Sequence, residues 1–141
     1  LLLLAILLTL VLGATMRHNH AGLAIPDFPF NWGRIIPPLE TFPVAIHFAH
    51  RVAAYTVLVL VLITHAHTLR AHRGETWLTY PAIAVELLVV VQIALGAMII
   101  WTTKSVPMTV LHLANGGLLF GSAAILHLRA HVLERKVGAS A

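Results

Sequence analysis

Cysteine is absent from this sequence, and charged side chains are scarce. Without cysteine, the chain has no disulfide framework and no thiolate metal site. Only 10% of the residues are charged and 59% are hydrophobic, which gives a mean hydropathy of +0.89. A water-soluble domain needs more polar surface than this composition supplies. We therefore expect an integral membrane protein that is surrounded by membrane lipid.

Acidic residues are also few, with five against nine lysines and arginines. The basic residues do not form a stripe interleaved with aromatic side chains, which is typical of nucleic-acid-binding surfaces, so no nucleic-acid partner is predicted. In a membrane protein, this modest excess of positive charge bears on orientation instead.

Four apolar runs are long enough to approach or span a bilayer, which takes about 20 apolar residues. They predict helices at about 1–16, 44–69, 78–101 and 107–128. Little of the chain is left for anything else. We therefore expect an all-α fold, a single four-helix transmembrane domain over residues 1–141.

The long loop 17–43 contains five prolines, and its aromatic residues Phe28, Phe30 and Trp32 are of the type found at membrane interfaces. A polar basic tail is expected at 129–141. Five lysines and arginines lie on the side of the short turn and tail, and three on the side of the loop: Arg70, Arg73, Arg129, Arg135 and Lys136 against Arg17, Arg34 and Lys104. By the positive-inside rule, the tail faces the cytoplasm and loop 17–43 faces outside.

Two of the ten histidines are matched in depth. His50 lies six residues after Val44 and His112 five after Pro107, so each is about 8–9 Å into its helix at a rise of ~1.5 Å per residue. Both helices start on the outer side. Two imidazoles facing each other in a bundle core are suited to ligate one heme iron from both faces. The alternative is that each is a hydrogen-bonded core residue.

Small and basic residues surround this pair. Glycines at a similar depth leave room for a flat macrocycle: Gly13, Gly96, Gly116 and Gly117. Gly13 and Gly96 each sit in a Leu-Gly-Ala segment, a weak repeat that divides the chain into two helical hairpins. Arg51, with His47 one turn before His50 and Arg34 from the loop, either pairs with heme carboxylates or extends to lipid headgroups.

A second histidine pattern favours a different site. His65 follows His50 by 15 residues, and His127 follows His112 by the same spacing. This is what a two-heme electron wire needs, although 15 residues rotate the lower histidine by about 60° from the upper one. The alternative is that these lower histidines lie at the cytoplasmic interface of the membrane and bind no heme. Glu86, within the third helix, is interpreted as a proton-path residue, a partner of His65, or a structural group.

Several segments together resemble the heme A synthase family: residues 21–29, Gly33, Pro37 and Pro38, His50 and Arg51, residues 92–97, and Leu111 with His112. Full-length members of that family are similar to two fused four-helix units, an eight-helix protein with pseudo-twofold symmetry. This sequence is more similar to the C-terminal cofactor half. The resemblance implies a heme b with His50 and His112 as iron ligands, and heme O is the alternative occupant.

The resemblance also implies a function and partners. The family oxidises the methyl group of heme O to the formyl group of heme A, for assembly of cytochrome c oxidase. Expected partners are heme O synthase, an upstream homologous half or a second copy, and a quinol or other electron partner, in a bacterial-type inner membrane. His47 occupies the position of a glutamate in the catalytic half, and Ile25 that of a common cysteine.

These two departures leave the catalytic residues unassigned. The leading hypothesis is a heme A synthase-like oxidoreductase unit. The alternatives are a diheme b-type cytochrome for transmembrane electron transfer and a non-catalytic assembly factor for cytochrome oxidase.

Overall fold

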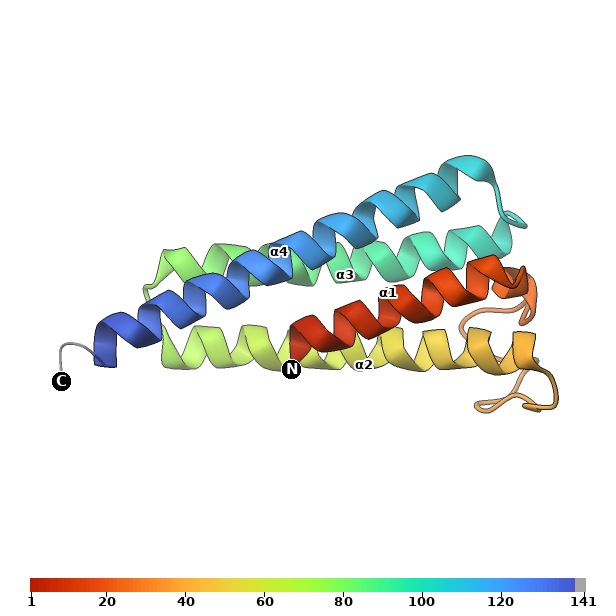
Figure 1. Ribbon diagram of the computed structural model, residues 1–141, viewed down its shortest axis with the longest axis horizontal. Coiled ribbons are helices and arrows are strands. Elements are labelled where there is room, and N and C mark those ends of the chain that lie inside the picture. Colours follow the sequence, from red (N-terminus) through yellow and green to blue (C-terminus); the bar gives the residue numbers. More distant parts are fainter. Residues whose placement is uncertain (139–141) are drawn as a thin grey trace.

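Four helices and one short 3-10 helix make up the computed structural model, which describes residues 1–138 (Figure 1). In chain order they are α1 (Leu2–His18), η1 (Ala21–Leu23), α2 (Phe42–Ala71), α3 (Thr76–Trp101) and α4 (Val106–Gly138). The all-α fold of a membrane helical bundle is therefore confirmed. By length and composition, α2, α3 and α4 can each cross a membrane, whereas α1 is a shorter apolar helix of 17 residues, about 25 Å long.

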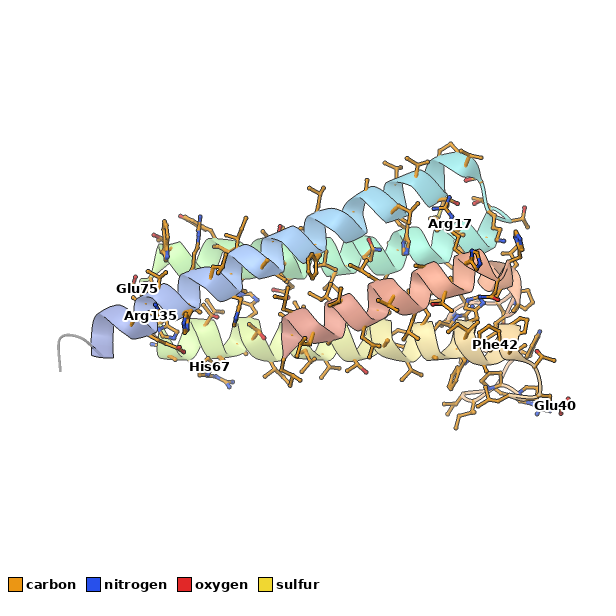
Figure 2. All side chains as sticks on the ribbon, viewed as in Figure 1. Arg17, Glu40, Phe42, His67, Glu75 and Arg135 are labelled. Atoms are coloured by element: carbon orange, nitrogen blue, oxygen red, sulfur yellow. The ribbon has the colours of Figure 1, made fainter. Side chains whose placement is uncertain are left out.

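The helices pack as two hairpins, α1 with α2 and α3 with α4, joined by the contact of α2 with α3. In Figure 1, α4 runs diagonally across the other helices, and α1 lies along the half of α2 nearest the long loop. Figure 2 shows Arg17, Glu40 and Phe42 at this loop end and His67, Glu75 and Arg135 at the opposite end. The chain thus has a loop end and a turn end.

The hydrophobic core occupies the half of the bundle nearer the α2–α3 turn. Its buried side chains come from all four helices: Ile6, Val57, Val61, Leu78, Ala82, Val85, Val89, Leu119, Ala123 and Leu126. Interdigitated apolar side chains of this kind fill the space between the helices. The loop half of the bundle is packed differently, because polar side chains and glycines replace this cluster there.

Helix α4 continues well beyond 128, the expected start of a polar tail. Its extension is amphipathic, because Leu126, Ala130 and Leu133 recur at helical spacing and pack on the core cluster. Arg129 donates a hydrogen bond to the Trp77 carbonyl at 3.0 Å, and its guanidinium lies 4.1 Å from the Trp77 ring centroid. The charged residues Arg129, Glu134 and Arg135 lie among these apolar positions, so the sequence was interpreted as a polar tail. Of the expected tail, residues 139–141 lie outside the described residues.

The tip of the long loop is held by Asp27. Its two carboxylate oxygens accept hydrogen bonds from the N–H groups of Trp32, at 2.8 Å, and Gly33, at 3.1 Å. Both residues have left-handed backbone, with φ of 55° and 70°. The Trp32 N–H contributes most to holding the pKa of Asp27 below its usual 3.8, because hydrogen bonds to the charged form favour it.

Replacing Asp27 by Ala should therefore free the two amides and speed their hydrogen–deuterium exchange, measured by mass spectrometry on peptides that cover residues 31–34. Acid should act in the same way on the unmodified chain. Because the pKa of Asp27 is lowered on folding, its contribution is complete above about pH 3.8 and is lost as the pH falls through the lowered value. Glu40→Ala, at an exposed carboxylate in the same loop, is the control and should leave the exchange unchanged.

Candidate functional site

A cavity of about 930 Å³ opens at the loop end, between all four helices. Its volume falls within the range of ligand and cofactor sites. Most of the wall is apolar. Arg34 and Gly117 do not line it, but seven other residues predicted around a cofactor do: Gly13, His47, His50, Arg51, Gly96, His112 and Gly116. The chain thus brings together residues that are separated by up to 103 positions in sequence.

His50, on α2, is held by the backbone of α1. Its Nδ1 lies 3.1 Å from the carbonyl oxygen of Thr9. A carbonyl oxygen only accepts hydrogen bonds, so Nδ1 carries the proton and the Nε2 of the neutral ring keeps its lone pair. Metal-binding histidines commonly donate their second N–H to a carbonyl in this way. His50 is therefore arranged as a ligand that binds through Nε2.

His112, on α4, is held by two side-chain amides. Asn115 donates to the Leu88 carbonyl at 3.0 Å and to the Gln92 Oε1 at 2.7 Å. This fixes Gln92 as a donor, and its Nε2 lies 3.1 Å from the His112 carbonyl and 3.2 Å from the His112 Nε2. The other ring nitrogen, Nδ1, is buried and has no hydrogen-bond partner. Because an unpaired buried polar atom costs free energy, a ligand that reorients this ring recovers some of it.

Two glycines lie behind the two imidazoles. A Cβ added at Gly13 would sit 2.9 Å from the His50 Cε1, and one at Gly96 would sit 3.4 Å from the His112 Cε1. The repeated Leu-Gly-Ala segment thus has the same role in each hairpin, in which it makes room for the histidine of the following helix. The room predicted for a macrocycle at Gly13 and Gly96 is thus taken up by the histidine rings.

The other two glycines predicted at this depth are placed differently. Gly116 faces Gln92, whose Nε2 would lie 3.1 Å from an added Cβ. Gly117 is exposed, does not line the cavity, and has nothing within 4 Å of its Cβ position. Only Gly116 of this pair belongs to the cavity wall.

Arg51 is buried, with 6% of its surface exposed, and all five of its N–H groups are engaged. Four of them reach the long loop and one reaches back along α2: the carbonyls of Ile25 at 3.0 Å, Asp27 at 2.8 Å and Phe30 at 2.8 Å, the Asn31 Oδ1 at 3.0 Å, and the His47 Nε2 at 3.2 Å. Neither a ligand carboxylate nor a lipid headgroup is its partner in this arrangement. Arg51 fixes the loop over the cavity.

His47 lies between two donors, the Ile25 N–H at Nδ1 and the Arg51 Nε–H at Nε2, each 3.2 Å away. A neutral imidazole accepts at one nitrogen only, so when Nε2 accepts from Arg51, Nδ1 carries the proton and the Ile25 N–H loses this acceptor. A carboxylate at this position would satisfy both. Of the described residues that line the cavity, none is Asp or Glu.

The lower histidines form no second site with the same geometry. His65 contacts Glu86 through Nδ1, the pairing that the sequence analysis considered, and its Nε2 is buried without a partner. His127 is exposed, and neither His65 nor His127 lines the cavity. Among the described residues, no cluster of three or more His, Asp or Glu side chains could hold a metal ion.

Four side chains at the mouth of the cavity were not predicted as site residues from the sequence. Arg17, His18, His20 and Lys104 line it from the end of α1, the following loop and the α3–α4 turn. Arg17 and Lys104 were counted only for orientation. Their position next to the ends of two helices that both carry a Leu-Gly-Ala segment was the available signal.

Arg51→Lys should release the long loop. A lysine ammonium has three donors and cannot reach five acceptors that the planar guanidinium spans. We expect a loss of about 2–4 kcal/mol of stability, measured as a lower unfolding temperature in detergent, together with faster amide exchange over residues 25–31. Arg34→Lys, in the exposed part of the same loop, is the matched control. Equal behaviour of the two variants would contradict the role given to Arg51.

Comparison with known proteins gives a consistent family. The model of the family described as "Cytochrome oxidase assembly protein" matches residues 1–124. The heme A synthase of Halalkalibacterium halodurans is 35% identical over 108 residues, 77% of this chain and 36% of that protein. The heme A synthase of Alkalihalophilus pseudofirmus is 33% identical over 114 residues, 81% of this chain and 38% of that protein.

The heme A synthase of Geobacillus thermodenitrificans is 28% identical over 129 residues, 92% of this chain and 40% of that protein. The chain thus spans well under half the length of the curated relatives it matches. The matched residues include the long loop and both cavity histidines, because they lie within 1–124. The chain therefore belongs to the heme A synthase family of cytochrome oxidase assembly proteins.

Proposed function

We propose that this chain binds one heme B, with His50 and His112 as the two axial ligands of the iron, as the cofactor-carrying unit of a heme A synthase. The observation that supports this most directly is the pair of imidazoles from α2 and α4 in the wall of one cavity, each with a glycine behind it. Imidazole is a common axial ligand of heme iron, and bundle cores are common cofactor sites.

The donor set fits such a group. The Thr9 carbonyl keeps the Nε2 lone pair of His50 free. For His112 to bind iron, its lone pair must leave Gln92, which then retains two partners, the His112 carbonyl and Asn115. Neither imidazole has to lose a proton, because a neutral ring is the ligating form.

When bound, a heme supplies one-electron redox chemistry. The residues of this chain hold and shield it: Thr9 fixes the tautomer of His50, and the amides of Gln92 and Asn115 orient His112. The long loop, fixed by Arg51, limits the access of water from the loop end. Phe28 of this loop lines the cavity and packs edge-on against Trp101, with ring centroids 6.2 Å apart.

Within the enzyme, the unit is proposed to pass electrons rather than to oxidise the heme O methyl group itself. The described lining of the cavity offers no carboxylate, and His47 is engaged by the loop and Arg51. Oxidation of heme O to heme A would then take place in a second homologous unit, upstream in the same polypeptide or in a second copy, supplied by heme O synthase. The electron partner is proposed to be a quinol or a similar small carrier.

The same proposal gives an orientation in a bacterial-type inner membrane. Basic residues near the turn end include Arg70, Arg73, Arg129 and Arg135, and the exposed ones near the loop end are Arg17, Arg34 and Lys104, since Arg51 is buried in the bundle. By the positive-inside rule, the turn end and the end of α4 face the cytoplasm. The heme cavity would open to the outside.

The first test is the number and type of hemes in the detergent-purified chain, by reduced-minus-oxidised spectrum and pigment extraction. We expect one heme B with a low-spin spectrum, lost in His50→Ala and in His112→Ala and retained in the control His127→Ala. Bound heme O or heme A would make the cavity a substrate site. Two hemes that depend on His65 and His127 would instead favour a transmembrane electron wire, and a heme-free active chain would favour an assembly factor.

Gly13→Ala should weaken heme binding, although Gly13 has no side chain that could bind the iron. The added methyl group would lie 2.9 Å from the His50 ring and must push it away from the Thr9 carbonyl. We expect a partial loss of the low-spin spectrum in favour of a high-spin form, and a lower heme occupancy. Gly117→Ala adds the same methyl group in open space and is the matched control. Identical spectra of the two variants would contradict the backing role of Gly13.

A further inference from the structure

Positive charge gathers at the mouth of the cavity without acidic residues to balance it. Of the five acidic residues, Glu75, Glu86 and Glu134 belong to the turn end, and Asp27 is engaged by the backbone of the loop tip. The fifth, Glu40, lies at the loop end but away from Arg17, as Figure 2 shows. Among the described side chains, neither Arg17 nor Lys104 forms an ion pair, although both line the cavity.

The backbone at Thr103 and Lys104 adopts a left-handed conformation that is unfavourable for residues with a side chain. After α3 ends, the N–H groups of Thr103 and Lys104 bond back to the carbonyls of Ile100 and Ile99, at 3.1 and 2.7 Å. This is the Schellman arrangement, in which glycine normally takes the left-handed position. Here Thr103 and Lys104 adopt it, with φ of 49° and 67°. Strained residues of this kind cluster at ligand sites, and here the result is an ammonium group at the cavity mouth.

A glycine of the loop accommodates the same side chain. A Cβ at Gly22 would sit 3.0 Å from the Lys104 Cε and 3.7 Å from its Nζ. Gly22 is buried in η1 and lines the cavity. The Lys104 stem therefore lies across Gly22, between the loop and the end of α3, while the residue as a whole stays exposed.

Arg17 comes from a different helix, α1. It lies in the last turn of α1, where a cation also interacts favourably with the helix dipole, and its side chain is exposed at the cavity. An exposed guanidinium with free donors can bind a carboxylate bidentately. Arg51, the arginine adjacent to His50, has no free donor for this purpose, because all five are used by the loop and His47.

We propose that Arg17 and Lys104 form a carboxylate-binding subsite that holds the two propionate groups of the heme at the cavity mouth. The inference rests on the heme site proposed above. A heme placed between His50 and His112 has an apolar ring suited to the apolar wall and two carboxylates that need water or cations. The mouth supplies both cations, and neither forms an ion pair among the described side chains.

The test compares heme B with its dimethyl ester, which has the same iron and ring but no carboxylate charge. The apo chain, in nanodiscs of zwitterionic phosphatidylcholine, is titrated with each compound and followed at the Soret band. We expect about tenfold tighter binding of the free acid at low salt, with the preference falling as ionic strength rises. In the double variant Arg17→Gln/Lys104→Gln, the two compounds should bind about equally, with the affinity for the ester unchanged.

The control is Arg34→Gln/Arg73→Gln, which removes the same charge from exposed residues outside the cavity and should keep the preference. Lys104→Arg should keep it as well, because charge at that position is what matters. An unchanged preference in the Arg17→Gln/Lys104→Gln variant overturns the subsite while leaving the heme site intact. Failure of both compounds to bind overturns the heme site itself.

A lipid arm separates the two sources of negative charge. The same titrations are repeated in nanodiscs that contain anionic phosphatidylglycerol. If Arg17 and Lys104 serve headgroups instead of propionates, the unmodified chain shows no preference for the free acid in either lipid, which overturns the proposal. A preference that survives in zwitterionic lipid and is merely reduced in anionic lipid supports it.

Discussion

Arg51 brings a permanent positive charge into a mostly apolar bundle, and the loop half of the structure depends on how that charge is satisfied. In apolar surroundings an unpaired donor is expensive, so each of its five N–H groups needs an acceptor. Three loop carbonyls, one Asn side chain and His47 supply them. The same contacts satisfy carbonyls of a loop with four prolines, which has little secondary structure of its own. Since His50 is the next residue back along α2, the loop and the candidate ligand are fixed to the same turn of helix.

The parts that could be predicted from the sequence follow from regular geometry. Helix rise is constant, so the matched depth of His50 and His112 could be read from their distances to the helix starts. The contacts of Arg51 could not, because they end on carbonyls of an irregular loop that no periodicity describes. The extension of α4 was missed because polarity was given more weight than the apolar spacing of Leu126, Ala130 and Leu133. Arg17 and Lys104 were not predicted as site residues, because a basic residue near a helix end is also explained by membrane orientation.

The two hairpins share a glycine–histidine contact but differ in what holds each histidine ring. In each, a glycine of the first helix makes room for a histidine of the second, as Gly13 does for His50 and Gly96 for His112. The partners of the rings are unlike, since a backbone carbonyl holds His50 and an amide chain holds His112. The Thr9 carbonyl can only accept a hydrogen bond from His50. Gln92 can release the His112 ring, because its amide also donates to the His112 carbonyl. The tautomer of His50 is thus fixed, whereas the ring of His112 can exchange its partner. The repeated Leu-Gly-Ala segment in the sequence does not predict this difference.

The separation of the packed half from the hollow half has a consequence for biogenesis. None of the ten buried residues of the core cluster lines the cavity, so the contacts that hold the helices together at the turn end are complete without any ligand. The packing of the bundle therefore does not require the cavity to be occupied. The half that stays hollow lies at the loop end, so a ligand added after assembly would enter a bundle whose turn end is already closed.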